Sequence, residues 1–576
     1  MGRTQNSTGG ADGFLIRRCQ AFPTRPSTVL SLDAPPRGGP PLVDVRIAAG
    51  HIVEVSAPGL PALPGQPVID AAGGALLPGL HDHHVHLMSQ AAAIRSVGVG
   101  PPTVVDRGGL GAALRAGRPP AGQGWVRAVG YHPSVAGELD RDALDDLCGD
   151  RPVRLQHRGG ALWVLNSAAI ARAGVADCPL PGVERDASGR PTGRLWRMDD
   201  WLRANPAIPP VTLDLAAVGR QAAARGVTGF TDATPGRGPA ERRLLVEAAR
   251  HGALPQRLVL MRPEPAPAPC EPSPPGPPAP PAHPGPPGPC ARPGPPARPG
   301  VVDGPVKIIL DDDRLPELDG LTARIDAAHL AGHPVAVHCV TRVQTVLTLA
   351  ALAAAVPVSG RSAAREPTTT VAGTTGRGGG EGDGGGDRIE HGAVLPSELY
   401  GELRERGLTV VTQPNFVAER GDQYLVDVDD EDPGSLYPAA SLVRAGVRLA
   451  GGTDTPFGGA DPWAAVRAAV RRSTAAGTLL GGDERLPAVT ALALFLGHSD
   501  DPARLRTIRP GAPADLVLLR PGLTDVLADP RAEHVRCTFV AGVLVHPEDA
   551  EQGRVIRADA DGAGDMAGGE AAGGDR

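Results

Sequence analysis

Short apolar runs alternate with amphipathic stretches through the middle of the chain. The runs are rich in Val, Ile and Leu, and the stretches between them are rich in Ala, Leu and Arg. This alternation is typical of βα units that build a parallel sheet. It predicts strands over residues 76–86, 227–232, 257–261, 306–311, 334–340, 387–391, 408–413 and 447–454, and helices over residues 238–251, 317–331, 343–355, 396–406 and 461–476. Eight such units predict an α/β fold, a closed (β/α)8 TIM barrel.

The two ends of the chain show a different pattern. Apolar and other residues alternate over 43–47 and 51–55, and a similar strand-like pattern occurs over 515–519 and 538–543. A period of two predicts β-hairpins with one buried face. We therefore expect a small β-sandwich built from both ends, with 13–75 as its N-terminal part and 501–556 as its C-terminal part. The barrel would then span 76–500.

Four segments depart from the barrel pattern. Residues 90–224, after the first strand, are too long for a loop and predict an insertion with structure of its own. Residues 263–300 hold 19 prolines without a period of three, which predicts a disordered polyproline insert. Residues 359–386 predict a Gly-rich disordered loop, and residues 557–576 a disordered tail.

Composition narrows the classes of function. The 57 basic and 64 acidic residues give a net charge of -7, which argues against a nucleic-acid binder. The sequence has no apolar run long enough for a membrane helix and no signal-peptide pattern. Seven scattered cysteines fit a reducing compartment. We expect a cytoplasmic protein that acts on a small molecule, with no nucleic-acid or membrane partner; a homodimer is one expectation for its assembly.

Lysine occurs only once, at position 307, and all other basic residues are arginines. A genome rich in G and C replaces lysine by arginine wherever any positive charge suffices. The retained Lys307 therefore indicates a role that arginine cannot fill, because a buried lysine can lose its proton and become a nucleophile or a carbamate. The alternative is a residual lysine left by chance.

Candidate ligands stand at the ends of the predicted strands, where barrel enzymes place their chemistry. They are four imidazoles, one amine and one carboxylate: His84, His86, Lys307, His338, His391 and Asp454. Residues two apart in a strand share a face, so both imidazoles of His84-x-His86 could hold one ion. Imidazole and carboxylate suit zinc, with iron, nickel or manganese as competitors. The alternatives are hydrogen-bonded core histidines and an Asp454 that caps a helix.

An ordered set of motifs resembles the amidohydrolase superfamily. Its opening, Pro-Gly-hydrophobic-x-Asp-x-His-x-His, is matched by residues 77–86, which read Leu-Pro-Gly-Leu-His-Asp-His-His-Val-His. Further segments resemble the branch often called amidohydrolase family 3, which includes N-substituted formamide deformylase and related metal-dependent hydrolases. These segments are 162–167, 191–193, 226–232, 306–308, 335–338, 388–391, 413–414, 452–456 and 510–517.

The resemblance implies a centre of two divalent metal ions, with zinc foremost. The six candidate ligands would hold these ions, and carbon dioxide would enter as a carbamate on Lys307. Asp454 would also be the catalytic base, and Trp163 and Gln413 would contact substrate, although core packing is the plainer role for the tryptophan. Two segments depart from the family pattern, 157–161 and 311–314. The implied reaction is hydrolysis of a C–N bond in an amide, N-formyl or cyclic amide group.

Other readings of the same residues stay open. The site could belong to a lactonase or esterase, because an activated hydroxide attacks both acyl types. It could belong to a mononuclear deaminase in which Lys307 is structural. A scaffold that has lost its metals, or an interaction protein that acts through the polyproline insert, has less support.

Overall fold

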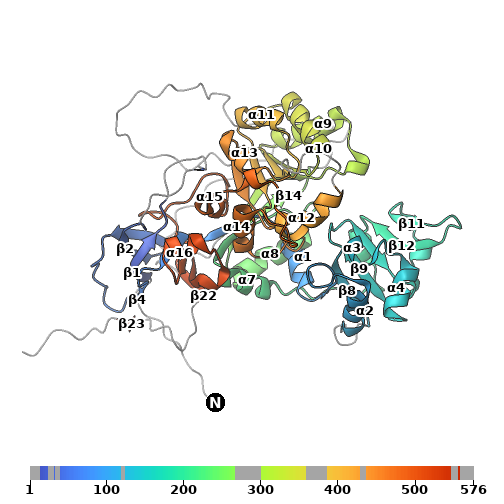
Figure 1. Cartoon of the computed structure of the whole chain (residues 1–576), viewed down its shortest axis with the longest axis horizontal. Coiled ribbons are helices and arrows are strands. Elements are labelled where there is room, and N and C mark those ends of the chain that lie inside the picture. The colour runs from blue at the N-terminus through green and yellow to red at the C-terminus, as the bar shows by residue number, and fades with distance from the viewer. Residues whose placement is uncertain are drawn as a thin grey trace, which may run out of the picture.

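The computed structural model describes residues 13–23, 32, 39–117, 124–265, 300–358, 386–427, 436–546 and 556–557. The expected polyproline insert, Gly-rich loop and tail lie almost wholly outside these residues. Three sheets are present among the described residues. An eight-stranded sheet lies in the middle, with a nine-stranded sheet at one end of the long axis and a six-stranded sheet at the other (Figure 1).

The central sheet is parallel, as predicted, and is nearly closed into a barrel. Its order is β19-β18-β17-β16-β15-β14-β13-β6. The strands are β6 (Leu80–Val85), β13 (Val227–Asp232), β14 (Arg257–Arg262), β15 (Val301–Ile308), β16 (Val335–Cys339), β17 (Arg388–His391), β18 (Thr409–Thr412) and β19 (Arg448–Gly451). The main helices that follow them are α8 (Pro239–His251), α9 (Leu318–Leu330), α10 (Arg342–Ala354), α11 (Tyr400–Glu405), α12 (Asn415–Asp427), α13 (Ala439–Arg444), α14 (Pro462–Arg471) and α15 (Ala488–Ala493). This arrangement confirms the predicted (β/α)8 fold.

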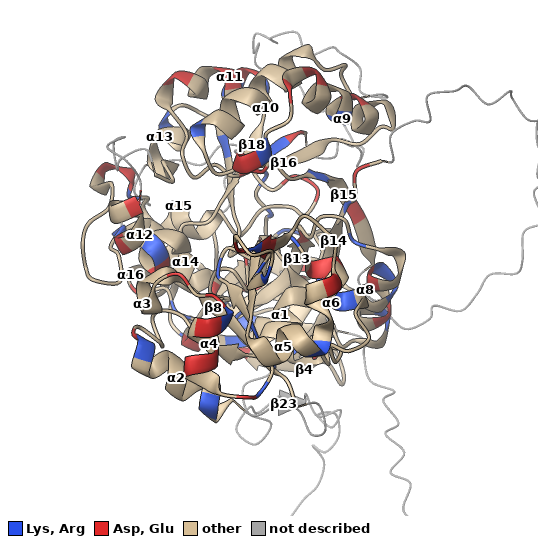
Figure 2. Ribbon diagram, turned by 90° about the vertical axis from the view of Figure 1, so that its right-hand side faces the viewer, with Lys and Arg blue, Asp and Glu red and all other residues tan. Residues whose placement is uncertain are grey.

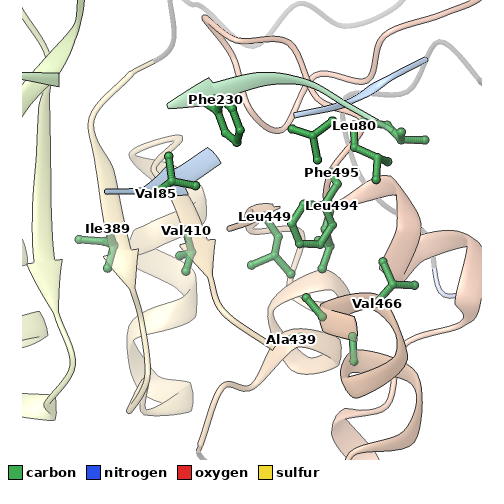
Figure 3. Packing of buried hydrophobic residues seen from close by; sticks show 14 of the residues in the cluster. Leu80, Val85, Phe230, Ile389, Val410, Ala439, Leu449, Val466, Leu494 and Phe495 are labelled. Carbon is green, nitrogen blue, oxygen red and sulfur yellow. The ribbon is translucent and has the colours of Figure 1, made fainter. Parts of the chain in front are cut away.

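The outer strands of the barrel sheet, β6 and β19, meet at a seam. The residues after α15 fill it, because His81 N–H donates to the carbonyl of Phe495 and Gly451 N–H donates to that of Leu494, at 2.8 and 2.9 Å. Both of these residues are fully or almost fully buried. They pack with Leu80 and Leu449 in one hydrophobic core (Figure 3). Because β6 and β19 do not pair with each other in the sheet, apolar packing and a few backbone hydrogen bonds close the barrel at this seam.

The first predicted strand, 76–86, is in fact two strands. β5 (Ala75–Pro78) pairs with strands of the nine-stranded sheet, and only β6 belongs to the barrel. Gly79 lies between them, and a Cβ atom there would lie 2.1 Å from Cγ2 of Thr228. Only glycine lets the chain pass so close to the neighbouring strand, so this residue marks where the chain changes sheets.

Strands from both ends of the chain share the nine-stranded sheet. The N-terminal strands are β1 (Gly13–Ala21), β2 (Leu42–Ala48), β3 (His51–Ser56), β4 (Pro67–Asp70) and β5, and the C-terminal strands are β20 (Leu516–Leu519), β21 (Val535–Val540), β22 (Val543–His546) and β23 (Ile556–Arg557). The two halves join where β20 runs antiparallel to β5, with Leu516 opposite Pro78, and again where β23 runs antiparallel to β4. Hydrogen bonds thus make one continuous sheet, whose strands from both ends share a buried core.

The segment between β6 and β13 carries the six-stranded sheet, which we call the inserted sheet. Its order is β11-β12-β10-β9-β8-β7. The strands are β7 (Val97–Gly98), β8 (Val126–Tyr131), β9 (Val153–His157), β10 (Leu162–Leu165), β11 (Val183–Arg185) and β12 (Pro191–Trp196). The helices of this segment are α1 (Leu87–Ala93), α2 (Arg107–Ala116), α3 (Pro133–Ala136), α4 (Arg141–Cys148), α5 (Ser167–Ala173), α6 (Asp199–Ala204) and α7 (Leu215–Ala224). Alternate residues of β10 enter two separate cores, so both faces of the inserted sheet are covered.

Two further features of the fold are the distribution of its charged residues and the length of its helices. Lys and Arg positions are interspersed with Asp and Glu positions along the helices in the ribbon of Figure 2. None of the helices in the described ranges combines the length and the apolarity that a bilayer crossing requires.

Candidate active site

Three of the predicted ligands form a compact group at the end of the barrel strands. Oδ1 of Asp454 lies 3.1 Å from Nε2 of His86 and 3.6 Å from Nε2 of His84. One ligand atom from each residue lies within 4.8 Å of the others. Two imidazole nitrogens and a carboxylate oxygen in such proximity are a donor set that suits a divalent transition metal.

The other two histidines extend this group. The ring of His391 lies 4.7 Å from that of His84, and the ring of His338 lies 4.4 Å from that of His391, measured between centroids. Burial lowers the pKa of all three imidazoles well below the usual value, and the positive charge of Lys307 adds to the effect. The rings are therefore neutral near neutral pH, which is the form that binds metal.

Lys307 lies in the same charged environment, on β15. Its side chain is among the largest that are fully buried, and its Nζ has no hydrogen-bond partner among the described residues. Burial lowers the pKa of Lys307, whereas the carboxylates of Glu390 and Asp454 act in the opposite direction. A buried amine without a hydrogen bond is costly, so this position fits an amine that acquires a further partner.

The Nδ1 atoms of three histidines contact residues outside the predicted ligand set. Nδ1 of His84 contacts Glu390, Nδ1 of His391 lies 2.8 Å from Oε1 of Gln413, and Nδ1 of His86 lies 3.2 Å from the hydroxyl of Thr234. These contacts hold each ring through Nδ1, so Nε2 is the nitrogen that could bind a metal. Metal-ligating histidines almost always have such a partner. The donor set and its supporting contacts therefore fit a metal.

Sequence reasoning missed the supporting pair Glu390 and Arg388 on β17. Both side chains are buried, and Nε of Arg388 lies 2.6 Å from Oε1 of Glu390. The signal was present in the sequence, because two charged residues at alternate positions of an otherwise buried strand point to the same face.

Asp82 is a second missed residue, and it joins the two sides of the seam. Its carboxylate accepts from the backbone N–H of Thr453 at 2.9 Å and from its hydroxyl at 2.6 Å. The backbone N–H of Asp454 donates to the carbonyl of His84 at 2.8 Å. Gly452 permits this approach, since a Cβ there would lie 2.6 Å from that of His84. The ligands from β6 and from the end of β19 are thereby held at a fixed separation.

The backbone at two predicted ligands is strained. His391 has a φ of 72° and Asp454 a φ of 57°, in the left-handed region that residues other than glycine seldom adopt. Each such residue costs about 1–3 kcal/mol, and such residues cluster at functional sites, although Ala49 and Ala72 in the nine-stranded sheet region adopt the same conformation. The left-handed backbone at His391 and Asp454 agrees with a site that holds these two side chains in fixed orientations.

The two predicted substrate contacts lie in different places. Gln413 is fully buried, and its amide oxygen contacts His391. Trp163 lies on the inserted sheet, where its indole N–H donates to Asp199 at 2.9 Å. The structure therefore brings Gln413 to the six predicted ligands and places Trp163 in another group of residues. The catalytic, ligand and substrate roles of all these residues stay predictions.

Comparison with known proteins places the chain in a class. A sequence model of the amidohydrolase family matches residues 67–546. The chain therefore belongs to the amidohydrolase family, a family of hydrolases, as its motifs predicted.

Individual relatives are distant. N-substituted formamide deformylase of Arthrobacter pascens is 25% identical over 537 residues, covering 84% of this chain and 90% of that protein. Two uncharacterized metal-dependent hydrolases share the fold. That of Pyrococcus horikoshii has a TM-score of 0.58 at 15% identity and covers 90% of this chain and 98% of that one. That of Pyrococcus furiosus has a TM-score of 0.57 at 18% identity, with 90% and 99% covered.

Proposed function

We propose that this protein is a metal-dependent amidohydrolase that hydrolyses a C–N bond of a small amide, N-formyl or cyclic amide. The observation that carries the proposal is the group of His84, His86 and Asp454, whose ligand atoms lie within 4.8 Å of one another at the end of the barrel strands. The relative that acts on N-substituted formamides supports the choice of the C–N bond.

The chain's own residues would divide the work. His84, His86 and Asp454 would hold one divalent ion, and His338, His391 and a carbamate on Lys307 would complete a second. Bound divalent ions, with zinc the first candidate, polarise an acyl oxygen and make hydroxide available at neutral pH. In the balanced reaction, water adds its oxygen to the acyl carbon and the C–N bond breaks.

Asp454 would carry the proton in this reaction. Burial alone would raise its pKa, but a hydrogen bond from His86, together with the electrostatic influence of the neighbouring imidazoles, holds the pKa below its usual value. The carboxylate is thus ionised at neutral pH and can take the proton of the attacking water. It would then give that proton to the leaving nitrogen, so an open-chain substrate gives a carboxylic acid and an amine or ammonia, and a cyclic amide gives one ring-opened molecule that carries both groups.

The first test is the metal content per chain, measured by elemental mass spectrometry on protein purified in bicarbonate buffer. About two equivalents, falling by one or more in Lys307→Arg, support the carbamate-linked pair. About one equivalent, unchanged in that variant, favours a mononuclear centre, which the three-residue group alone could form. No metal after addition of zinc would refute the hydrolase proposal.

A substrate panel then separates the acyl classes. Matched amides, N-formyl amines, lactones and esters are compared by kcat/KM with the metal-loaded protein. Faster turnover of amides supports C–N hydrolysis, and faster turnover of esters or lactones contradicts it. Asp454→Asn should lose activity on every substrate, and Arg194→Gln, a change on the inserted sheet, serves as the control.

A further inference from the structure

A cavity of about 260 Å³ lies between the inserted sheet and α1, outside the group of predicted ligands. One part of its wall is apolar and includes Met88, Leu202 and Ile208. The other part is charged and includes Arg127 and Arg154. α1 begins at Leu87, directly after His86, and its residue Met88 lines the cavity, whereas none of the six predicted ligands does.

The two arginines face each other across neighbouring strands. β8 and β9 are parallel, and Arg127 is the register partner of Arg154. Like charges directly opposite each other destabilise a sheet. Both guanidinium groups also lie over the indole of Trp163, at 5.2 and 5.7 Å from the ring centroid. The fold therefore gathers two positive charges on one aromatic side chain.

Little in the protein neutralises these charges. Arg154 is 8% exposed, and its Nε is buried without a hydrogen-bond partner among the described residues. Arg127 donates to the hydroxyl of Ser96, and in the described ranges neither guanidinium has an ion-pair partner. Burial lowers the pKa of both arginines to about 10, and Asp199 opposes that shift only in part. One buried cation, Arg154, and one partly buried cation, Arg127, thus have a single nearby carboxylate, which already accepts from Trp163.

We propose that this cavity binds a small carboxylate with an apolar body. Arg203 and Glu241 also line the cavity but pair with each other at 2.6 Å, so Arg127, Arg154 and the carboxylate of Asp199 leave one positive charge to be balanced, which matches a monoanion. The planar guanidinium forks of Arg127 and Arg154 suit the two oxygens of a carboxylate. The apolar wall opposite would cover the rest of the ligand. The volume lies near the lower limit of small-molecule pockets, so the ligand is small.

The test is calorimetric titration of the metal-loaded protein with phenylacetate and isovalerate. Phenylethanol serves as the neutral counterpart, and inorganic phosphate as another anion. We expect both carboxylates to bind, and the alcohol and phosphate to bind at least about tenfold more weakly. Absence of carboxylate binding at millimolar concentration, or equal binding of the alcohol or of phosphate, overturns the proposal.

Variants locate the binding. Arg154→Gln and, separately, Arg127→Gln should each raise the Kd of the carboxylates about tenfold or more. Arg194→Gln is the matched control, because Arg194 also lies over a tryptophan, Trp196, at 5.6 Å but is paired with Glu138 at 2.7 Å outside the cavity. A Kd that moves equally in the control, or in neither cavity variant, overturns the proposal.

A carboxylate could also bind at the proposed metal site, so Asp454→Asn is titrated as well. Survival of binding in that variant, with loss in Arg154→Gln, supports a separate carboxylate site. The reverse pattern assigns the binding to the metal site and overturns the proposal. Because the readout is binding, this result stands apart from whether the protein hydrolyses amides. Melting temperatures check that each variant is folded. Because Arg127 and Arg154 are like charges that face each other, removal of either one should leave the melting temperature equal or higher.

Discussion

The buried contact between Glu390 and His84 gives the sharpest test of how this site is built. The change is Glu390→Gln, which keeps the shape of the side chain and one carbonyl oxygen to accept from Nδ1 of His84. It removes the negative charge that faces both His84 and Arg388. Two effects should follow, one on metal affinity and one on folding.

Both magnitudes follow from the burial of these groups. Loss of a residue that orients a ligating histidine typically costs 10–100-fold in metal affinity, or about 1.4–2.8 kcal/mol. Arg388 is 4% exposed and would keep a buried charge without its partner. Removal of one member of a buried ion pair costs about 3–5 kcal/mol of unfolding free energy. The folding effect should therefore exceed the effect on metal binding.

The assay separates the two effects. Urea unfolding of metal-free protein gives the folding term, because bound metal would add its own stabilisation. Competition with a chelator gives the metal affinity. The double variant Arg388→Met with Glu390→Gln should recover much of the unfolding free energy but not the metal affinity. Glu402→Gln is the control, since its pair with Arg406 is partly exposed at 2.8 Å and contributes less than about 1 kcal/mol.

Metal affinity equal to that of the wild type in Glu390→Gln would refute the reasoning. It would mean that the charge at Glu390 does not tune His84 as a ligand. Recovery of metal affinity in the double variant would also refute it, because the loss would then come from distortion of the strand.

Three further outcomes are expected. In bicarbonate enriched in ¹³C, the protein should give one side-chain carbamate resonance that Lys307→Arg abolishes, and a resonance that persists in the variant would refute the assignment. Nδ1 and Nε2 of His329 lie 2.6 Å from the carbonyl of Val356 and 3.0 Å from Asp387; burial opposes protonation, but these acceptors raise the pKa of His329 above 6.5. A group whose pKa is raised in the folded state stabilises the fold fully below pH 6.5, and this stabilisation is lost as the pH rises through the folded-state pKa. Urea unfolding should therefore show that His329→Gln loses less unfolding free energy than the wild type between pH 6.5 and the folded-state pKa. The same dependence of unfolding free energy on pH in both proteins would contradict the assignment. Phe495→Ala should lower the unfolding free energy by about 3–5 kcal/mol, and a loss below about 1 kcal/mol would show that the seam does not depend on this ring.

The barrel could be predicted from the sequence because its strands are buried on both faces and read as apolar runs. β13 coincides with the predicted strand 227–232. The division of 76–86 at Gly79 could not be predicted in the same way, since apolar periodicity does not tell which sheet a strand joins. That choice depends on Thr228 and on the partner strand β20, which are distant in sequence.

The site residues show the same limit: features that depend on sequence spacing can be predicted, and contacts between residues far apart in the sequence cannot. His84 and His86 could be predicted from their spacing, and Lys307 because it is the one lysine in the sequence. The opposition of Arg127 and Arg154, in contrast, arises from the register of two strands that the sequence alone does not pair. Gln413 is predicted as a substrate contact, which stays a prediction, and its contact with His391 could not be read from the sequence.

The pairing of β5 with β20 has a consequence for how this chain is made. Pro78 lies opposite Leu516, so the two partners leave the ribosome about 440 residues apart. At the usual 5–20 residues per second, β5 waits about 20–90 seconds for that neighbour during synthesis. Through this interval one edge of β5 is open to pairing with other chains. The nascent polypeptide therefore needs this edge shielded, by a chaperone or by its own earlier strands, until β20 has been synthesised.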